Sequence, residues 1–292
     1  MSRPKLKLDL VNVTFLSVSH ALALVAVLYM IFSDQFQWWS LVLGCVYFAF
    51  CGLAITGGYH RLFSHPTYQA RGFLRFFYLF FGAASVQNSA LKWSSDHRIH
   101  HGEVDTNNDP YNIQEGFWWA HVGWILFKDK NELTNVSDLK KDKLVMLQHN
   151  HFILFIALSL LVLPMALGMI WGDPIGAVLV AGFLRLTIQW HATFSINSIA
   201  HVIGSQPYST KNSARDSVVT AFITLGEGYH NFHHTFAGDY RNGIRWFHFD
   251  PTKWFVWSCS KVKITWDLKR ASADAIERAK AAVRAERSLP VV

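Results

Sequence analysis

The chain has 292 residues, of which 51% are hydrophobic, 15% are aromatic and only 16% are charged. This composition excludes an average soluble domain and indicates an all-α integral membrane protein with several apolar spans. The formal net charge of +7 is not organised into a nucleic-acid-binding motif. Lys and Arg instead flank the apolar segments, so we expect orientation charges in a membrane lipid environment and no nucleic-acid partner.

The three cysteines are Cys45, Cys51 and Cys259. They form no Cys-x-x-Cys pair, and an odd, scattered set predicts neither a disulfide framework nor a thiolate metal site. We therefore expect the polar side of the protein to face a reducing cytosol.

The first apolar segment, residues 11–32, is long enough to cross roughly 30 Å of hydrocarbon. It is longer than the core of a signal peptide and no small-residue cleavage site follows it, so we predict an uncleaved membrane span. His20 lies inside this span and is expected to be packed and hydrogen-bonded rather than to bind a metal.

A second span is predicted for residues 38–56, which begins with a Trp pair that suits a membrane interface. The loop before it has no Lys or Arg, so the positive-inside rule places this loop outside and the N-terminus in the cytosol. His60 and His65 follow the span and are five residues apart, which one α-helical face does not present together. Pro66 disfavours helical geometry in the residue before it, so we expect the chain to leave its helix between the two histidines.

Residues 73–86 form an apolar segment that is too short for a span. We predict an interfacial helix there, and a buried core helix is the alternative that the sequence leaves open. The polar stretch that follows contains the aromatic segment 116–124, which is expected to rest on the membrane surface. This stretch also carries the strongest run of positive charge, which predicts a cytosolic position: Lys128, Lys130, Lys140, Lys141 and Lys143.

Two more spans are predicted for residues 152–170, interrupted by Pro164, and for residues 175–196. The loop between them lacks Lys and Arg, so four spans leave both termini and every histidine cluster on the cytosolic side. The fourth span also holds three polar residues that are costly in lipid and are expected to face protein or a cavity: Arg185, Gln189 and His191.

The tail, residues 261–292, is basic, and residues 273–287 have helical character. We predict a solvated helix, with a surface for anionic lipid or an acidic protein as the alternative. His121, His149 and His151 lie outside any cluster spacing and are expected to be interfacial or structural.

Histidines gather in three clusters, which are His60 with His65, His97 with His100 and His101, and His230 with His233 and His234. In the last two clusters the residues stand at i, i+3 and i+4, so each trio should project from one helix face toward one place. Asn197 and His201 share a helix face just beyond the fourth span, which adds a ninth candidate imidazole. So many nitrogens exceed one tetrahedral zinc site and predict two metal ions.

Carboxylates are expected to orient these rings. Asp96 beside His97 and Glu227 one turn before His230 are the candidates, and the alternative is that both are ordinary solvated charges. Nitrogen-rich sites without thiolate favour redox-active iron over a closed structural zinc site. Two such irons could activate dioxygen, and the apolar spans could shelter a hydrocarbon substrate whose unactivated methylene needs a strong oxidant.

These histidine boxes resemble those of the membrane fatty acyl desaturases, and specifically the stearoyl-CoA (acyl-CoA 9-desaturase) type. The likeness extends from about Gly57 to Asp239 and is carried by Gly-Tyr-His-Arg-Leu-Phe-Ser-His at 58–65, Asp-His-Arg-Ile-His-His at 96–101, Gly-Phe-Trp-Trp-Ala-His-Val-Gly-Trp at 116–124, Asn-Ser-Ile-Ala-His at 197–201 and Gly-Glu-Gly-Tyr-His-Asn-Phe-His-His-Thr-Phe at 226–236. It implies a single desaturase domain over residues 1–292, with four transmembrane helices, interfacial helices and a cytosolic cap that holds a di-iron site. The implied reaction is oxygen-dependent removal of two hydrogens from a saturated long-chain acyl thioester to leave a cis double bond, expected at the 9,10 position.

The resemblance also implies the site residues, carried over by position. The iron ligands would be His60, His65, His97, His100, His101, His201, His230, His233 and His234, and Asn197 would meet an iron through water. The sequence does not say how nine histidines divide between two irons. The family takes two electrons per turnover from a separate donor such as cytochrome b5, or a ferredoxin with its reductase, which the basic residues between Lys128 and Lys143 or the tail could dock.

The chain departs from animal members of the family just before the aromatic segment, where Asn112-Ile-Gln-Glu115 replaces paired basic residues. Asp129 also follows Lys128 where a second basic residue is usual. A surface with fewer cations is less suited to binding the nucleotide of an acyl-CoA, since phosphate binding favours Arg and Lys. An acyl-lipid desaturase acting on a phospholipid acyl chain, or one using an acyl carrier protein, is therefore an alternative. A membrane di-iron hydroxylase and a histidine-rich metal transporter or metal-binding membrane protein are the rival functions.

Overall fold

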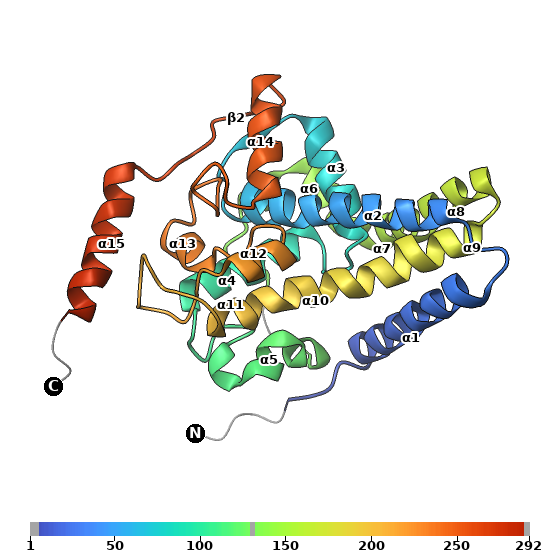
Figure 1. Ribbon diagram of the computed structural model, residues 1–292, viewed down its shortest axis with the longest axis horizontal. Helices are drawn as coiled ribbons and strands as arrows, with labels where there is room; N and C mark the ends of the chain where they lie inside the picture. Colours follow the sequence, from blue (N-terminus) through green and yellow to red (C-terminus); the bar gives the residue numbers. More distant parts are fainter. Residues whose placement is uncertain (1–5, 129–131, 289–292) are drawn as a thin grey trace.

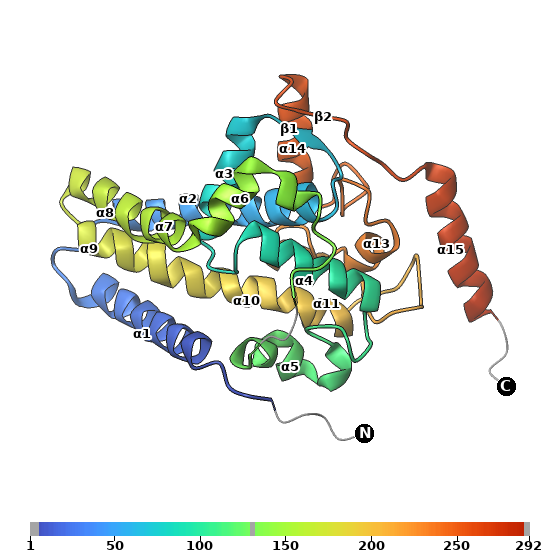
Figure 2. The same ribbon diagram turned by 180° about the vertical axis from the view of Figure 1, so that it is seen from behind.

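The computed structural model describes residues 6–128 and 132–288. Within these ranges four helices are long and apolar enough to cross a membrane, as the composition predicts. Figures 1 and 2 show them lying alongside one another, with the short connections at one end and a helical cap at the other. Asp129, Lys130 and residues 289–292 of the basic tail lie outside the described residues.

The four apolar helices coincide with the predicted spans, and the second and fourth extend further toward the cap. The first is α1 (Leu10–Phe32), and the second joins α2 (Trp38–Leu53) to the π-helix η1 (Ala54–Ser64). The third consists of α7 (Phe152–Ile156), the π-helix η5 (Ala157–Val162), α8 (Leu163–Gly168) and the 3-10 turn η6 (Met169–Trp171). The fourth consists of α9 (Pro174–Ala177), the π-helix η7 (Val178–Leu184), α10 (Arg185–Asn197) and α11 (Ile199–Val202).

The cap is built from the segments between the second and third spans and after the fourth span. The earlier segment contains β1 (Gln69–Ala70), α3 (Gly72–Ala83), α4 (Ala90–Glu103), α5 (Phe117–His121), α6 (Lys143–Asn150) and the 3-10 turns η2 (Ile113–Glu115), η3 (Gly123–Leu126) and η4 (Leu139–Lys141). The later segment contains α12 (Val218–Ile223), α13 (His230–Thr235), α14 (Pro251–Lys261), β2 (Thr265–Trp266) and α15 (Ala273–Arg287). β1 and β2 pair antiparallel, with Gln69 opposite Trp266, which ties the two parts of the cap together.

The helix of the second span continues past Thr56, and the chain leaves it between His60 and His65, as Pro66 predicts, because His65 caps the helix with non-helical φ and ψ. The helix continues to Ser64 by widening into η1, and the N–H of His65 donates to the carbonyl of His60 over 3.1 Å. A π-helix closes i→i+5 hydrogen bonds, so residues five apart lie above one another on the same face. The wider last turn of the helix therefore brings His65, just past its end, onto the same side as His60.

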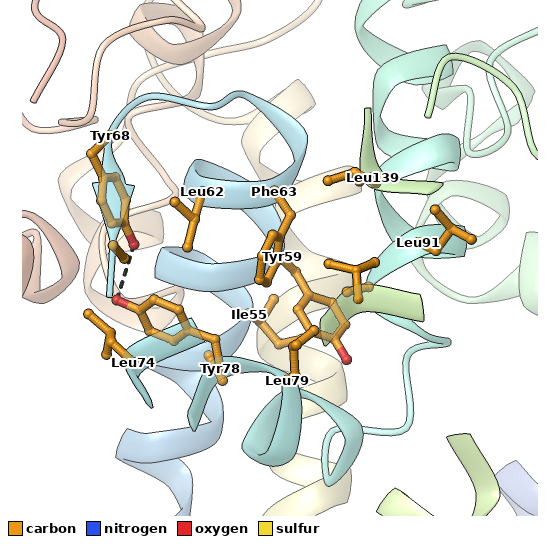
Figure 3. Close-up of a cluster of buried hydrophobic side chains, with 14 of the residues drawn as sticks. Ile55, Tyr59, Leu62, Phe63, Tyr68, Leu74, Tyr78, Leu79, Leu91 and Leu139 are labelled. Carbon is orange, nitrogen blue, oxygen red and sulfur yellow. Dashed lines mark hydrogen bonds between the residues drawn. The ribbon is translucent and has the colours of Figure 1, made fainter. Parts of the chain in front are cut away.

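The π-helix η1 is buried along its whole length because cap helices surround it. Figure 3 shows Tyr59, Leu62 and Phe63 among side chains from neighbouring cap segments, and the hydroxyl of Tyr68 donates to that of Tyr78 over 3.1 Å. A Cβ on Gly58 would lie 2.5 Å from the Cβ of Tyr78, so α3 approaches η1 closely only because this residue is glycine. This packing holds the first histidine cluster in a rigid environment.

α3 and α15 each differ in part from the expectation. α3 is half-buried: Leu74 and Tyr78 pack inside, whereas Phe73 and Phe76 are exposed, so it combines the interfacial and core alternatives. α15 is not simply a solvated helix, because Ile276 packs with Tyr208 and with Phe232 of α13. The tail helix therefore covers the element that carries the last histidine cluster.

Polar residues inside the fourth span mostly face protein, as their cost in lipid requires. Arg185 and Gln189 are buried and bonded to each other, and the Arg185 guanidinium also donates to the carbonyl of Ala84. His191 differs because its side chain is exposed, although it lies 3.1 Å from His20 and from His121. His20 is hydrogen-bonded, as expected.

The end of the bundle opposite the cap is held by one buried carboxylate, Asp173. It accepts hydrogen bonds from the Tyr29 hydroxyl, the Gln37 N–H, the Ser40 hydroxyl and the Gly176 N–H. Tyr29, Ser40 and Gly176 belong to the first, second and fourth spans, and Gln37 directly precedes the second. One side chain therefore fastens three spans at this end.

We expect Asp173→Ala to destabilise the protein, because each buried donor left without a partner costs about 1–3 kcal/mol. The apparent Tm in detergent should fall by roughly 5–10 °C. Asp34→Ala removes an exposed carboxylate from the loop at the same end and serves as the matched control. Equal melting of the two variants would contradict the role given to Asp173.

Candidate metal centre

The nine predicted histidines come together as two adjoining groups. The first group contains His60, His65, His97, His101 and His233, and the second contains His100, His201, His230 and His234. Within each group the candidate ligand atoms all lie within 4.8 Å of one another. The rings of His101 and His234 stack with centroids 4.2 Å apart, so the two groups share a boundary. The structure thus supplies the division that the sequence left open.

The expectation that each trio points to one place is wrong. On α4, His97 and His101 join the first group and His100 joins the second, whereas on α13 His230 and His234 join the second group and His233 joins the first. At about 100° per residue, positions i and i+4 differ by about 40°, whereas i+3 and i+4 differ by about 100°. Each helix therefore gives its i, i+4 pair to one group and its i+3 residue to the other.

The nitrogen separations fit a bound ion in each group. In the first group, the Nε2 atoms of His60 and His233 are 2.9 Å apart, and those of His65 and His97 are 2.8 Å apart. In the second, His230 Nε2 lies 3.1 Å from the Nε2 atoms of His201 and His234. Bonds of about 2.1 Å from neighbouring positions to one ion place two nitrogens about 3 Å apart. The donor set therefore fits two metal ions held by imidazole.

Burial favours the uncharged, metal-binding form of most of these imidazoles. Loss of solvent, followed by repulsion from neighbouring histidines, lowers the pKa well below its ordinary value for His65, His97, His101, His230, His233 and His234. A ligand nitrogen must carry a lone pair, so a neutral ring binds metal and a protonated ring does not. The same burial that makes charging costly therefore prepares the site for metal at neutral pH.

Glu227 orients the first group through His60. Its Oε2 lies 2.8 Å from His60 Nδ1, so Nδ1 carries the proton and Nε2 is left for a metal. Burial acts to raise the pKa of Glu227, but its interactions with His60 and Arg61 outweigh burial and lower this pKa to about 2. The carboxylate is therefore ionised at neutral pH.

A buried ionic network extends behind Glu227. The Arg61 guanidinium lies 2.9 Å from Glu227 and 3.0 Å from Asp250, and all three side chains are almost inaccessible to solvent. Asn242 donates over 2.7 Å to Glu227 Oε2, the oxygen that also contacts His60. Since an unpaired buried charge is costly, the network fixes the position of Glu227 and through it the ring of His60.

The second group is oriented by residues that the sequence analysis missed. Asp109 Oδ1 lies 2.9 Å from His100 Nδ1. His201 Nδ1 lies 2.7 Å from the Ser213 hydroxyl, which donates to Asp105 over 2.6 Å. Asp105 and Asp109 stand just after α4, four and eight residues beyond His101, and this proximity is the signal that could have indicated them.

The remaining candidates lie near the two groups. Asp96 is four residues before His100 on α4 and its Oδ1 lies 2.5 Å from Lys92 Nζ, so its role in orienting a ring stays a prediction. Asn197 at the end of α10 lies outside both histidine groups but lines the same cavity as His100 and His230. Its contact through water also stays a prediction.

The histidines outside the clusters belong to neither group. His121 bonds to the Ser198 hydroxyl and to His191, and His149 bonds to the Ser89 hydroxyl. His151 is exposed just before the third span. These positions fit the structural and interfacial roles expected for them.

A cavity of about 560 Å³ leads to the histidines. Its lining combines apolar side chains from all four spans with His60 and His97 of the first group and His100 and His230 of the second. Val11 of α1 and Ile153 of α7, which are exposed, also line it. This volume lies within the roughly 300–1,000 Å³ range of ligand pockets.

Comparison with known proteins agrees with this geometry. The family model for fatty acid desaturases matches residues 36–265. The chain belongs to the fatty acid desaturase family. It is 44% identical over 255 residues to a probable acyl-CoA desaturase of Schizosaccharomyces pombe, covering 86% of this chain and 53% of that protein.

Two further relatives give similar agreement with the desaturase family. Identity is 45% over 237 residues to acyl-CoA desaturase 1 of Saccharomyces cerevisiae, covering 80% of this chain and 46% of that protein. It is 34% over 282 residues to human stearoyl-CoA desaturase, covering 94% of this chain and 77% of that protein. The chain therefore spans about half the length of the two yeast relatives and most of the human one.

We expect Glu227→Gln to weaken metal binding by this desaturase-family chain, because it removes the charge that orients His60. Loss of such a partner typically lowers metal affinity 10–100-fold. Bound metal per chain, measured after dialysis against a chelator, should fall. Asp109→Asn should act likewise on the second group.

Glu277→Gln serves as the control for both variants, because this carboxylate is largely exposed on α15 and pairs only with Lys280 among its described ionic contacts. It should keep the full metal content. Full metal retention in Glu227→Gln as well would show that the carboxylate does not support the site.

Proposed function

We propose that the protein is an oxygen-dependent fatty acyl desaturase that introduces a cis double bond, at the 9,10 position, into a saturated long-chain acyl thioester. The observation that carries this proposal is the meeting of nine imidazoles in two groups at the wall of an apolar cavity. Family membership and yeast relatives named acyl-CoA desaturases support the same reaction.

Two iron ions are the proposed cofactors, one in each histidine group. His60, His65, His97, His101 and His233 would hold the first, and His100, His201, His230 and His234 the second, with Asn197 acting through water. When bound, the iron pair supplies, with dioxygen and two external electrons, the oxidising strength needed to take hydrogen from an unactivated methylene. Glu227, Asp109 and the Ser213–Asp105 pair keep the rings turned toward the metals.

The reaction balances as follows. The saturated chain loses two C–H hydrogens and gains one C=C bond. One dioxygen accepts these two hydrogens with two electrons from the donor and two protons from solvent, and leaves as two waters.

The cavity wall positions the acyl chain and excludes water. Gln87 donates to the Thr193 hydroxyl over 3.0 Å and accepts from the Trp93 indole over 3.4 Å, and all three residues line the cavity. Each side-chain N or O atom of these three residues therefore has a hydrogen-bond partner within the protein, which reduces its need for water. The pinned side chains therefore give the cavity a fixed shape beside the histidines, which suits oxidation at one position along a flexible chain.

Acyl-CoA is the proposed form of the substrate, in line with the names of the relatives. The departure at residues 112–115 weakens this choice. Asn112 caps η2 by accepting from the Gln114 N–H and also donates to the Thr106 carbonyl, so it serves the local fold. A phospholipid acyl chain and an acyl carrier protein are the alternatives, and they would reach the same cavity.

The proposed orientation places both termini and the histidine groups in the cytosol. The loops 33–37 and 172–173, which lack Lys and Arg, lie at the end of the bundle opposite the cap, and exposed lysines such as Lys140 and Lys141 belong to the cap. This arrangement follows the positive-inside rule.

We expect cells that express the protein to accumulate a new mono-unsaturated fatty acid, and His233→Ala to abolish it because the first group loses a ligand. Gas chromatography of total fatty acids measures the product and its double-bond position. His151→Ala, at an exposed histidine outside the two groups, should leave the product unchanged. A hydroxy acid in place of the alkene would favour the membrane hydroxylase, and metal accumulation without any new lipid would favour the transporter.

A separate electron donor, such as cytochrome b5 or a ferredoxin with its reductase, is the proposed redox partner. Its docking site is proposed at η4, where Lys140 and Lys141 are exposed. This turn follows Asp138, which pairs with Arg98 over 2.8 Å, so η4 is tied directly to the helix that carries His97. His65 and His101 of the first group are only half-buried, which suits electron transfer from the surface.

We expect the double variant Lys140→Glu, Lys141→Glu to slow donor-dependent turnover about tenfold at low salt, because it reverses the charge that attracts an acidic donor. The difference should shrink as added salt screens the charges. The matched double variant Arg278→Glu, Arg284→Glu changes the same charge on α15. If only the α15 variant turned over more slowly, the donor would dock at the tail. If neither variant turned over more slowly, docking by charge would be ruled out.

A further inference from the structure

Exposed apolar side chains gather on one part of the cap, formed by α12, the loop 244–249 and α14. We call these residues the aromatic patch: Val218, Val219, Phe222, Trp246, Phe247 and Trp257. Trp246 is 85% exposed, Val219 71% and Phe222 68%. Contiguous apolar surface of this kind marks a place that another apolar phase covers.

The aromatic patch is held in place by specific contacts. The ring of Phe249 lies 4.9 Å from that of Phe222 and 5.9 Å from that of Trp254, and the Trp254 indole donates to the Trp246 carbonyl over 3.1 Å. The buried ammonium of Lys253 donates to the carbonyls of Gly243, Arg245 and His248. The fold therefore presents these side chains outward as a defined surface.

The charge around the aromatic patch is positive. Residues 217–226 and 244–263 contain three exposed cations, which are Arg245, Lys261 and Lys263, whereas their one carboxylate, Asp250, is buried together with Lys253. Lys261 lies over the ring of Trp257 at 4.6 Å, and Arg245 lies over Phe247 at 5.8 Å. Tryptophan rings edged by cations are typical of the headgroup region of a bilayer, where anionic phospholipid attracts the charge.

The aromatic patch also continues from the membrane spans. The fourth span ends at Val202, which is exposed together with Ile203, and Figure 1 shows α12 beside the end of this span. In the same view α14 runs roughly across the direction of α10. A helix in this position lies along the plane in which the span leaves the hydrocarbon.

We propose that the aromatic patch rests in the headgroup region of the bilayer that holds the spans, on anionic phospholipid. α12 then has lipid on one side and the substrate cavity on the other, because Ile223 at its end and Leu225 just after it line that cavity. The proposal depends on the spans crossing a membrane and not on the reaction, so it stands or falls separately from desaturation.

Spin labels placed in nanodiscs of phosphatidylcholine and phosphatidylserine test this proposal. Single labels are attached at Phe222→Cys and Trp246→Cys in a background with Cys45→Ala, Cys51→Ala and Cys259→Ala. Collision with dioxygen, which dissolves in lipid, should exceed collision with a water-soluble nickel chelate at both positions. The control label at Lys280→Cys on α15 should show the reverse.

Three results would overturn the proposal. Preference for the nickel chelate at positions 222 and 246 would mean exposure to water. Spin–spin coupling between copies would mean a second chain, and protection from both reagents without such coupling would mean a different protein partner. Retained bound metal in each labelled variant checks that it has folded.

The lipid charge is tested on the same label. With phosphatidylserine present, the label at position 246 should lie deeper than in phosphatidylcholine alone. The triple variant Arg245→Glu, Lys261→Glu, Lys263→Glu should abolish this difference, whereas Lys211→Glu, an exposed lysine outside the aromatic patch, should keep it. A depth that does not respond to phosphatidylserine would contradict recognition of anionic phospholipid.

Discussion

The buried ion pair between Arg61 and Glu227 joins the second span to the segment that leads into α13. The same carboxylate accepts the Nδ1–H of His60, so one side chain fixes both the helix that bears the first histidine cluster and the ring that faces the metal. Removing one partner of a buried pair leaves an uncompensated charge at a cost of about 3–5 kcal/mol. The approach of His60 to His233, from elements far apart in the chain, depends on this contact.

Sequence reasoning reached the spans and the nine histidines because both follow short-range rules. An apolar run of sufficient length is readable without knowing its neighbours, and the i, i+3, i+4 spacing of His97, His100 and His101 fixes their relative directions on any α-helix. The division into two groups was not readable, since it depends on which helix faces each side of α4. The angle between His97 and His100 on their helix does not determine which of them lies near His201 and which near His233.

The residues that hydrogen-bond to the histidine rings were harder to predict for the same reason. Glu227 was a candidate because it stands near His230, yet it contacts His60, 167 residues earlier. The Ser213–Asp105 pair joins positions separated by 108 residues, and neither residue has a distinctive spacing. The π-helix was missed for a different reason: α-helical geometry separates His60 from His65, whereas the wider turn of a π-helix brings residues five apart onto one face.

The π-helix also connects the metal centre to the cavity and to the proposed membrane surface. Ile55 and Thr56 of η1 line the cavity one turn before His60, so the substrate wall and the first histidine group belong to one rigid element. The Thr56 hydroxyl lies 2.5 Å from that of Thr252, at the start of α14. α14 contributes Trp257 to the aromatic patch, so contact of that patch with headgroups would fix the depth of η1 in the membrane. The distance of the proposed metals from the hydrocarbon would then be set by the position of α14 in the headgroup region.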